Sequence, residues 1–166
     1  MIRRIYPASS RRNELYPRVV EALRAAGHLV HDWRENDLNW QDVDPDHASW
    51  TRANYVTALF TPAADRKFRA NRAAIHWADT CILILPCGRD AHAEFGFAAG
   101  LGKRTIVLLD AEHRGTPDLM HRFASDFADD IDALLVLLTR LPRVRSIRGL
   151  ISADRISWEE TDATTT

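Results

Sequence analysis

Two continuous apolar runs stand out in the middle of the chain, at residues 80–85 and 104–109. Apolar runs of this length, without alternation, are typical of parallel strands that are buried on both faces. Between them, residues 90–102 predict a helix, in which Gly96 and Gly100 lie four residues apart on one face, a spacing that lets a helix backbone approach a sheet closely. A strand, a helix and a strand within about 30 residues indicate a βαβ crossover.

The N-terminal part of the chain shows the same alternation in weaker form. Residues 2–6 predict a strand that ends at Pro7, and residues 28–31 predict a second strand. The helix predicted between them is capped by Asn13 and stopped by Gly27, and its apolar positions recur at helical spacing: Leu15, Val19, Leu23 and Ala26.

Further helices are predicted at residues 48–60, 63–77, 131–141 and, as a short one, near 117–122. Thr61 caps the second of these and Pro62 opens it, and Asp129 or Asp130 caps the helix at 131–141. That last helix is apolar nearly all round, so we expect it to be covered on more than one side, by its own sheet or by a second subunit. Residues 32–48 have little periodicity and predict a long, ordered loop.

Together these elements predict an α/β fold, with one Rossmann-like or flavodoxin-like parallel sheet and helices on both faces. The chain has 166 residues, a length that favours a single domain. We expect this domain to span residues 1–141 and a partly mobile C-terminal extension to span 142–166.

Composition and charge exclude several classes of function. The 22 basic and 23 acidic residues leave a net charge of -1, which argues against a nucleic-acid partner and against a polybasic membrane anchor. No apolar run approaches the roughly 20 residues of a spanning helix, and Met1 is not followed by a signal-peptide stretch, so we expect a soluble, cytoplasmic protein. Cys81 and Cys87 lie near the two ends of one strand, which excludes a disulfide framework and a Cys-rich zinc site.

Candidate chemistry concentrates after the run at 80–85. In an open parallel sheet, ligands bind beyond the carboxyl ends of the strands, where loops lead into helix N-termini. The loop there carries four polar or charged residues within six positions: Arg89, Asp90, His92 and Glu94. A carboxylate near a helix start is favoured in its ionised form. Glu94 is therefore either a nucleophile or electrostatic stabiliser, or a residue that merely complements the helix dipole.

Four segments resemble the nucleoside 2-deoxyribosyltransferase family: IYPASS at 5–10, RRN at 11–13, VVEALRAAGH at 19–28 and, most specifically, ADTCILILPCGRDAHAEFGFAAGLGK at 78–103. The resemblance covers about residues 2–140. It implies a parallel sheet with helices on both faces and cleavage or transfer at the N-glycosidic bond of a nucleoside or nucleotide. The family's nucleophile stands in a Glu-hydrophobic-Gly setting that opens a helix, and Glu94 matches it here. A carboxylate that attacks the anomeric carbon forms a glycosyl ester, which passes to water or to a second base.

The resemblance also implies substrate-binding residues. Family members that hydrolyse nucleoside 5′-monophosphates hold the phosphate through a serine and an arginine two residues on, the positions of Ser10 and Arg12. Tyr6 ends the first strand, where the family often places an aromatic residue against the ligand, and a core role is equally open. The loop residues that precede Glu94 are expected to bind sugar or base: Gly88, Arg89 and Asp90.

One position departs from the family pattern. The family carries an aspartate eight residues before the aspartate that opens the central strand, where it orients the sugar and assists the departing base. Counting back from Asp79 gives Asn71, which keeps the hydrogen-bonding shape but supplies neither a proton nor a charge. Three explanations stay open: an inactivating substitution made to trap a ligand, a natural loss or change of activity, or an alignment in which Asp65 or Asp90 takes the role.

The sequence also carries expectations about packing, metals and partners. Trp33, Trp40 and Trp50 are expected to pack rather than to stack on a base, and Asp79 to be structural. His76 and His92 have no metal-ligand spacing, so neither a metal nor another cofactor is predicted. The expected partner is a small nucleoside or nucleotide, and the expected assembly is a homodimer or larger homo-oligomer. Two alternative functions remain: a nucleotide-binding sensor that has lost turnover, motivated by Asn71, and a glycohydrolase acting on a dinucleotide such as NAD.

Overall fold

The computed structural model describes residues 1–109 and 116–140. Within them, five parallel strands form one sheet in the order β2-β1-β3-β4-β5. The strands are β1 (Arg4–Ala8), β2 (Leu29–Val30), β3 (Thr80–Ile84), β4 (Arg104–Leu108) and β5 (Asp126–Ala128). This is the flavodoxin-like order, in which the chain winds outward in both directions from the pair formed by β1 and β3. The predicted α/β fold class is confirmed.

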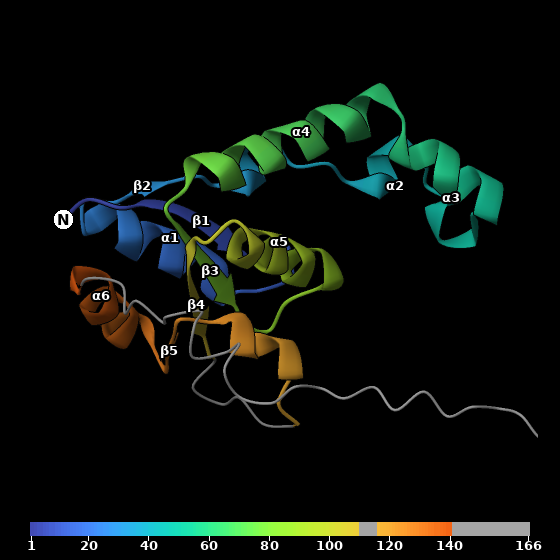
Figure 1. Cartoon of the computed structure of the whole chain (residues 1–166). Helices are drawn as coiled ribbons and strands as arrows, with labels where there is room; N and C mark the ends of the chain where they lie inside the picture. Colours follow the sequence, from blue (N-terminus) through green and yellow to red (C-terminus); the bar gives the residue numbers. More distant parts are fainter. Residues whose placement is uncertain (110–115, 141–166) are drawn as a thin grey trace, which may run out of the picture.

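Helices cover both faces of the sheet (Figure 1). One face carries α1 (Leu15–Ala25) and α6 (Ile131–Thr139), and the other carries α4 (Pro62–Trp77) and α5 (Arg89–Gly100). Because side chains alternate along a strand, Ile5 joins the first core and its neighbour Tyr6 joins the second. The two central strands, β3 and β4, are buried along their whole length, as their continuous apolar sequences predict.

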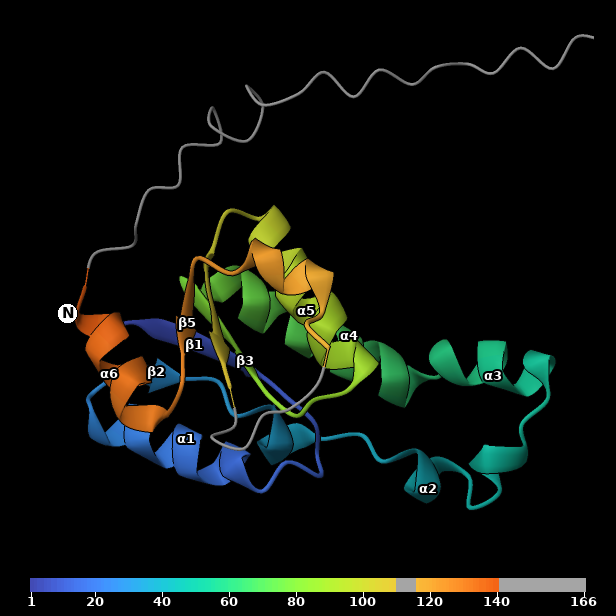
Figure 2. The same ribbon diagram turned by 90° about the horizontal axis from the view of Figure 1, so that it is seen from below.

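After β2, the chain forms η1 (Trp33–Asn36), whose Trp33 belongs to the first core, and then leaves the body of the domain. The stretch that follows contains α2 (Trp40–Val43), η2 (His47–Ser49) and α3 (Arg52–Leu59). Figures 1 and 2 both show α2 and α3 beyond the end of the sheet, so we call residues 40–61 the arm. The predicted loop at 32–48 is therefore ordered by short helices. The arm and the start of α4 expose several large apolar side chains: Tyr55, Val56, Leu59, Phe60 and Phe68.

The first strand differs from its prediction, because Pro7 lies inside β1 instead of ending it. The backbone of Ile5 bonds toward β2, since the His31 N–H donates to the Ile5 carbonyl, and that of Arg4 bonds toward β3. Pro7 therefore turns its missing N–H toward the β2 side, where β2 has already ended at Val30. Proline is tolerated there because no neighbouring strand needs its N–H for a hydrogen bond.

Helix boundaries were predicted with mixed success. Thr61 and Pro62 cap and open α4 as expected, and Asp130 caps α6. The helix predicted at 48–60 begins only at Arg52, because Thr51 caps it and residues 47–49 form a separate turn. Similarly, the short helix predicted near 117–122 is η3 (Leu119–Phe123).

The interpretation of the two glycines in α5 is wrong. A side-chain carbon added at Gly96 or Gly100 would meet no atom within 4 Å, so neither brings the helix close to the sheet. The buried face of α5 consists instead of Ala91, Phe95 and Ala98. Two small alanines allow the close approach, and Phe95 fills the space between them and the sheet.

The last strand, β5, has no counterpart in the sequence prediction. It has three residues and begins with Asp126, so it offers no apolar run to detect. Arg104, at the start of β4, compensates for this polar strand: its guanidinium lies 2.9 Å from the Asp126 carboxylate, and it also donates to the Leu137 and Arg140 carbonyls at the end of α6. One buried cation therefore joins β4, β5 and α6.

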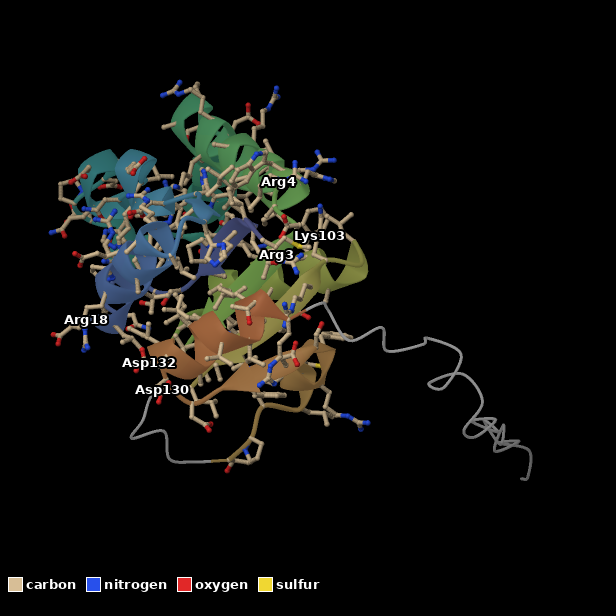
Figure 3. All side chains as sticks on the ribbon, turned by 90° about the vertical axis from the view of Figure 1, so that its left-hand side faces the viewer. Arg3, Arg4, Arg18, Lys103, Asp130 and Asp132 are labelled. Carbon is tan, nitrogen blue, oxygen red and sulfur yellow. The ribbon has the colours of Figure 1, made fainter. Side chains whose placement is uncertain are left out.

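The amino edge of the sheet is basic, as Figure 3 shows for Arg3, Arg4 and Lys103. Lys103 donates to the His76 carbonyl near the end of α4 at 2.7 Å, and Arg4 lies 3.8 Å from the Asp79 carboxylate. Asp79 also accepts from the Arg4 backbone, in keeping with its expected structural role. These charges support the framework at the edge opposite to the carboxyl ends of the strands.

The last helix, α6, is only partly covered. In α6, Leu134 and Leu138 are buried but Val136 is 51% exposed, so the sheet and α1 cover only part of this helix. Among residues 1–109 and 116–140, every helix is too short or too polar to cross a bilayer. The C-terminal extension expected at 142–166 lies outside the described residues.

Candidate active site at the carboxyl edge of the sheet

The winding of the sheet reverses between β1 and β3, and this is where open α/β sheets bind ligands. The loop after β1 and the loop after β3 meet there, and Asn13 joins them. The Asn13 amide donates to the Ile84 carbonyl at 3.2 Å and to the Pro86 carbonyl at 3.0 Å, while its oxygen accepts the Leu15 N–H at 2.9 Å. Asn13 was predicted to cap α1, but Glu14 occupies the N-cap position, and Asn13, one residue earlier, fastens two loops at the edge of the sheet.

Glu94 lies at this edge, in the second turn of α5, and is half-buried. Its Oε1 accepts two hydrogen bonds, from the Tyr6 hydroxyl at 2.7 Å and from the Asn71 amide at 2.9 Å. These donors come from β1 and α4, so three elements hold one carboxylate oxygen. Oε2 has no hydrogen-bond partner among residues 1–109 and 116–140, which leaves it available to a ligand.

The helix start was expected to favour the ionised form of Glu94, but its pKa is raised, chiefly because burial disfavours the charged carboxylate. The hydrogen bonds from Tyr6 and Asn71 and the charge of Lys67 act in the opposite direction, whereas Asp90 raises the pKa further. Burial, together with the Glu94 charge, also raises the pKa of Tyr6, so its hydroxyl stays protonated as a donor. The geometry thus holds a desolvated carboxylate through two neutral donors.

Lys67 and His31 belong to the same neighbourhood, although the sequence analysis did not single them out. Lys67 precedes Asn71 by one helical turn on α4, and its ammonium donates to the Trp33 carbonyl at 2.7 Å. His31 stacks on Tyr6 with ring centroids 5.7 Å apart. Burial lowers the pKa of both side chains. Lys67 had a detectable signal in its spacing from Asn71, but His31 is brought in only by the pairing of β2 with β1.

The proposed phosphate loop after β1 is held in shape by Arg34. Its guanidinium donates to the carbonyls of Ser10, Arg11 and Asn13 and lies 4.3 Å from the centre of the Tyr16 ring. Ser10 Oγ accepts the Arg12 backbone N–H at 3.2 Å, and the Arg12 side chain is exposed. The structure thus places both residues of the predicted pair at the carboxyl edge of β1.

The other residues predicted for the site differ in their burial and in whether they contact Glu94. Tyr6 is fully buried and its hydroxyl contacts Glu94, so it positions the carboxylate from within the core. Gly88, Arg89 and Asp90 are exposed at the start of α5. Asp90 is close enough to Glu94 to raise its pKa. Asp65 instead forms an exposed ion pair with Arg69 on α4 at 2.9 Å. Of these two aspartates, Asp90 is the one that influences the pKa of Glu94.

The three tryptophans pack against protein groups, as expected. Trp33 is buried beside Tyr16, with ring centroids 5.3 Å apart. Trp40 and Trp50 contact each other edge to face at 5.6 Å, and the Trp50 indole donates to Asp44. These contacts order the arm and the turn before it.

Known proteins resemble this chain in structure but not in sequence. By sequence, the chain matches no protein-family model and no curated protein. By structure, it is similar to a 2-deoxyribosyltransferase from the psychrotolerant bacterium Bacillus psychrosaccharolyticus, with a TM-score of 0.57 and 21% identity over 79% of this chain and 89% of that one. The chain shares the α/β fold of that protein.

Two other solved structures align with the chain. A conserved protein from Enterococcus faecalis gives a TM-score of 0.56 and 13% identity over 85% of this chain and 100% of that one. A CMP N-glycosidase from Clostridium botulinum gives 0.46 and 17% over 82% and 98%. The fold implied by the resemblance of residues 2–140 is confirmed. A fold does not by itself define a reaction, so the function of this chain depends on the side chains at its own site.

Proposed function

We propose that this protein cleaves or transfers the glycosyl group at the N-glycosidic bond of a nucleoside or a nucleoside 5′-monophosphate, with Glu94 as nucleophile. The single observation that carries the proposal is the environment of Glu94. Tyr6 and Asn71 hold one carboxylate oxygen, and the other has no hydrogen-bond partner among the described residues. Glu94 lies where the winding of the sheet reverses, between β1 and β3. The fold, shared with a 2-deoxyribosyltransferase, supports the same reading.

The reaction proceeds by two displacements. Glu94 Oε2 attacks the anomeric carbon, a C–O bond forms, and the C–N bond breaks with its electron pair leaving on the base. The glycosyl ester is then attacked by water or by the nitrogen of a second base, which releases Glu94 as a carboxylate. Two inversions give overall retention of configuration. The departing base takes its proton from solvent or from a protein acid.

Asn71 acts in this scheme as a positioning residue and cannot protonate the base. Its amide nitrogen is occupied by Glu94, and its oxygen is buried without a hydrogen-bond partner in the described part of the chain. That oxygen is available to a sugar hydroxyl, which would compensate an otherwise unpaired buried acceptor. The acid role falls to Asp90 or to solvent, because Asp65 is paired with Arg69.

Ser10 and Arg12 are proposed to bind the 5′-phosphate. A hydroxyl and a forked guanidinium near a helix N-terminus suit a phosphate, and Arg34 and Asn13 keep this loop in place beside the Glu94 site. Sugar or base contacts are expected on the other side of the site, where the loop after β3 leads into α5 through Gly88, Arg89 and Asp90.

The experiment incubates the protein with a panel of nucleosides and 5′-monophosphates, with and without an acceptor base, and separates the products by chromatography. Free base or exchanged nucleoside is expected from the parent and from Asn71→Asp. Product should vanish in Glu94→Ala, with Glu21→Ala, an exposed glutamate of α1, as the matched control. Base release at the parent rate from Glu94→Ala would overturn the proposal.

A second candidate, a nucleotide-binding sensor without turnover, is favoured by Asn71 itself. The amide donates to Glu94 where the resembled family has an acid, so the pocket is kept while the acid is lost. Calorimetric binding of a nucleotide, with no base released by the parent or by Asn71→Asp, is the outcome that would select the sensor.

A further inference from the structure

A cluster of metal-ligating side chains lies outside the site described above. His92 on α5, His121 on η3 and Asp118 just before η3 bring one ligand atom each to a common point. The Nε2 atoms of the histidines are 3.2 Å apart, and the Asp118 carboxylate oxygen lies 3.4 Å and 3.9 Å from them. We propose that these three residues bind a transition-metal dication, and that Zn²⁺ is the ion this donor set suits.

The separations match a coordination sphere. Imidazole nitrogens and carboxylate oxygens bind Zn²⁺ at about 2.0–2.2 Å, so ligand atoms of one tetrahedral ion are about 3.4 Å apart. The two imidazole rings are nearly parallel and meet through their Nε2 atoms, with centroids 5.3 Å apart. The Asp118 oxygen and the two Nε2 atoms form a triangle with sides of 3.2, 3.4 and 3.9 Å, so one ion can lie between all three.

The neighbourhood of His92 sets the tautomer that a metal needs. His92 Nδ1 lies 2.9 Å from the Gly88 carbonyl, which accepts its N–H and leaves a lone pair on Nε2. Metal-bound histidines usually donate their second nitrogen to a carbonyl or carboxylate in this way. Cys87 Sγ lies on the Nδ1 side, 3.4 Å from that atom, and so is not part of the three-atom set.

The cluster is accessible and separate from the Glu94 site. The Asp118 side chain is 66% exposed and that of His92 is 32% exposed. Both histidines border a hollow between α5 and η3 that is otherwise lined mainly by apolar side chains, among them Phe95, Met120 and Phe123. His92 and Glu94 are two positions apart on α5 and therefore point to different sides of the helix. The ion would join η3 to the start of α5, and it needs no assumption about the reaction at Glu94.

This proposal departs from the expectation of no metal. The ligands come from positions 92, 118 and 121, so no short motif links His92 to its partners. His121 follows Asp118 by three residues, a spacing that is common between polar residues and does not by itself indicate a metal site. Only the packing of η3 against α5 brings the three side chains together.

The test uses the full chain without a histidine tag, stripped with a chelator and titrated with ZnCl₂ by calorimetry. One Zn²⁺ per chain is expected. Since loss of a supporting hydrogen bond alone weakens metal sites by about 10–100-fold, His92→Ala and His121→Ala should each weaken binding by at least about 100-fold. His76→Ala, which removes an exposed histidine of α4, should leave the affinity unchanged.

A second measurement does not depend on how the variants fold. In ¹⁵N NMR spectra of the parent protein, Zn²⁺ should shift the Nε2 resonances of His92 and His121, while His92 keeps its Nδ1–H. If Zn²⁺ shifts neither resonance, the two imidazoles share only a proton and the proposal is wrong. Zn²⁺ binding that survives in the double variant His92→Ala/His121→Ala would overturn it as well.

Discussion

Glu94 illustrates how single residues combine opposing effects. Burial raises the pKa of its carboxyl, and the donors Tyr6 and Asn71 counteract that effect without adding charge. A nucleophile must be ionised, so activity should be lost as pH falls through the raised pKa. Under the proposed function, the hydrogen bonds therefore set how far into the acid range Glu94 stays ionised.

The first prediction concerns Tyr6→Phe. Without the phenol, Glu94 loses one donor to its charged form, so its pKa rises and the acid limb of the pH profile moves toward neutral pH. At acidic pH, kcat/KM for base release should fall by about ten- to hundredfold, since a hydrogen bond to a charged group is worth roughly 1.5–3 kcal/mol. Tyr55→Phe, on the exposed face of α3, is the control. An unchanged acid limb would show that Tyr6 does not act on Glu94.

The second prediction concerns the stability of Glu94→Gln. Because the folded-state pKa of Glu94 is raised, its contribution to stability is fully present below the ordinary glutamate pKa and is lost as pH rises through the raised one. At neutral pH the variant should therefore be more stable by about 1 kcal/mol, and the difference should vanish in acid. Urea unfolding at the two pH values measures this, and a destabilised variant at neutral pH would contradict it.

At the scale of elements, the site depends on how loops are fastened to strands. Asn13 joins the loop after β1 to the end of β3, and Arg34 holds the same loop from η1 through three carbonyls. Neither residue is proposed to touch substrate. They act by satisfying buried or half-buried backbone carbonyls that would otherwise lack partners.

The third prediction is that Asn13→Ala destabilises the fold by about 2–3 kcal/mol, because it removes a buried amide and leaves the Ile84 and Pro86 carbonyls without this donor. Asn39→Ala removes a comparable cap contact at the start of α2, where water can replace it, and should cost at most about 1 kcal/mol. Chemical denaturation compares the two. Equal losses would mean that Asn13 is no more than a helix cap.

At the scale of the whole molecule, the distribution of exposed apolar side chains bears on assembly. The apolar helix predicted at 131–141 favoured a subunit contact there, but only part of α6 is exposed. Larger apolar side chains gather on the arm and the start of α4, which extend beyond the sheet (Figure 2). An apolar surface of this kind is typical of a protein interface.

The fourth prediction follows from that surface. If the protein is a homodimer through the arm, Phe60→Glu should convert it to a monomer in sedimentation-velocity experiments, because Phe60 is 81% exposed in the single chain and a charge there would be desolvated in an interface. Phe127→Glu, at an exposed position of β5, is the matched control and should leave the mass unchanged. A parent protein that sediments as a monomer would exclude this assembly.

The sequence by itself determined the α/β class, the central strands and the position of Glu94 at a helix start, because these depend on local periodicity and on loops next to strands. The tertiary structure decided which groups surround Glu94: Tyr6 from β1, His31 beyond β2, and Lys67 with Asn71 from α4. It also decided that Pro7 fits inside a strand and that His92 meets Asp118 and His121. Contacts between residues distant in sequence arise from strand pairing and helix packing, and no local pattern encodes their distances.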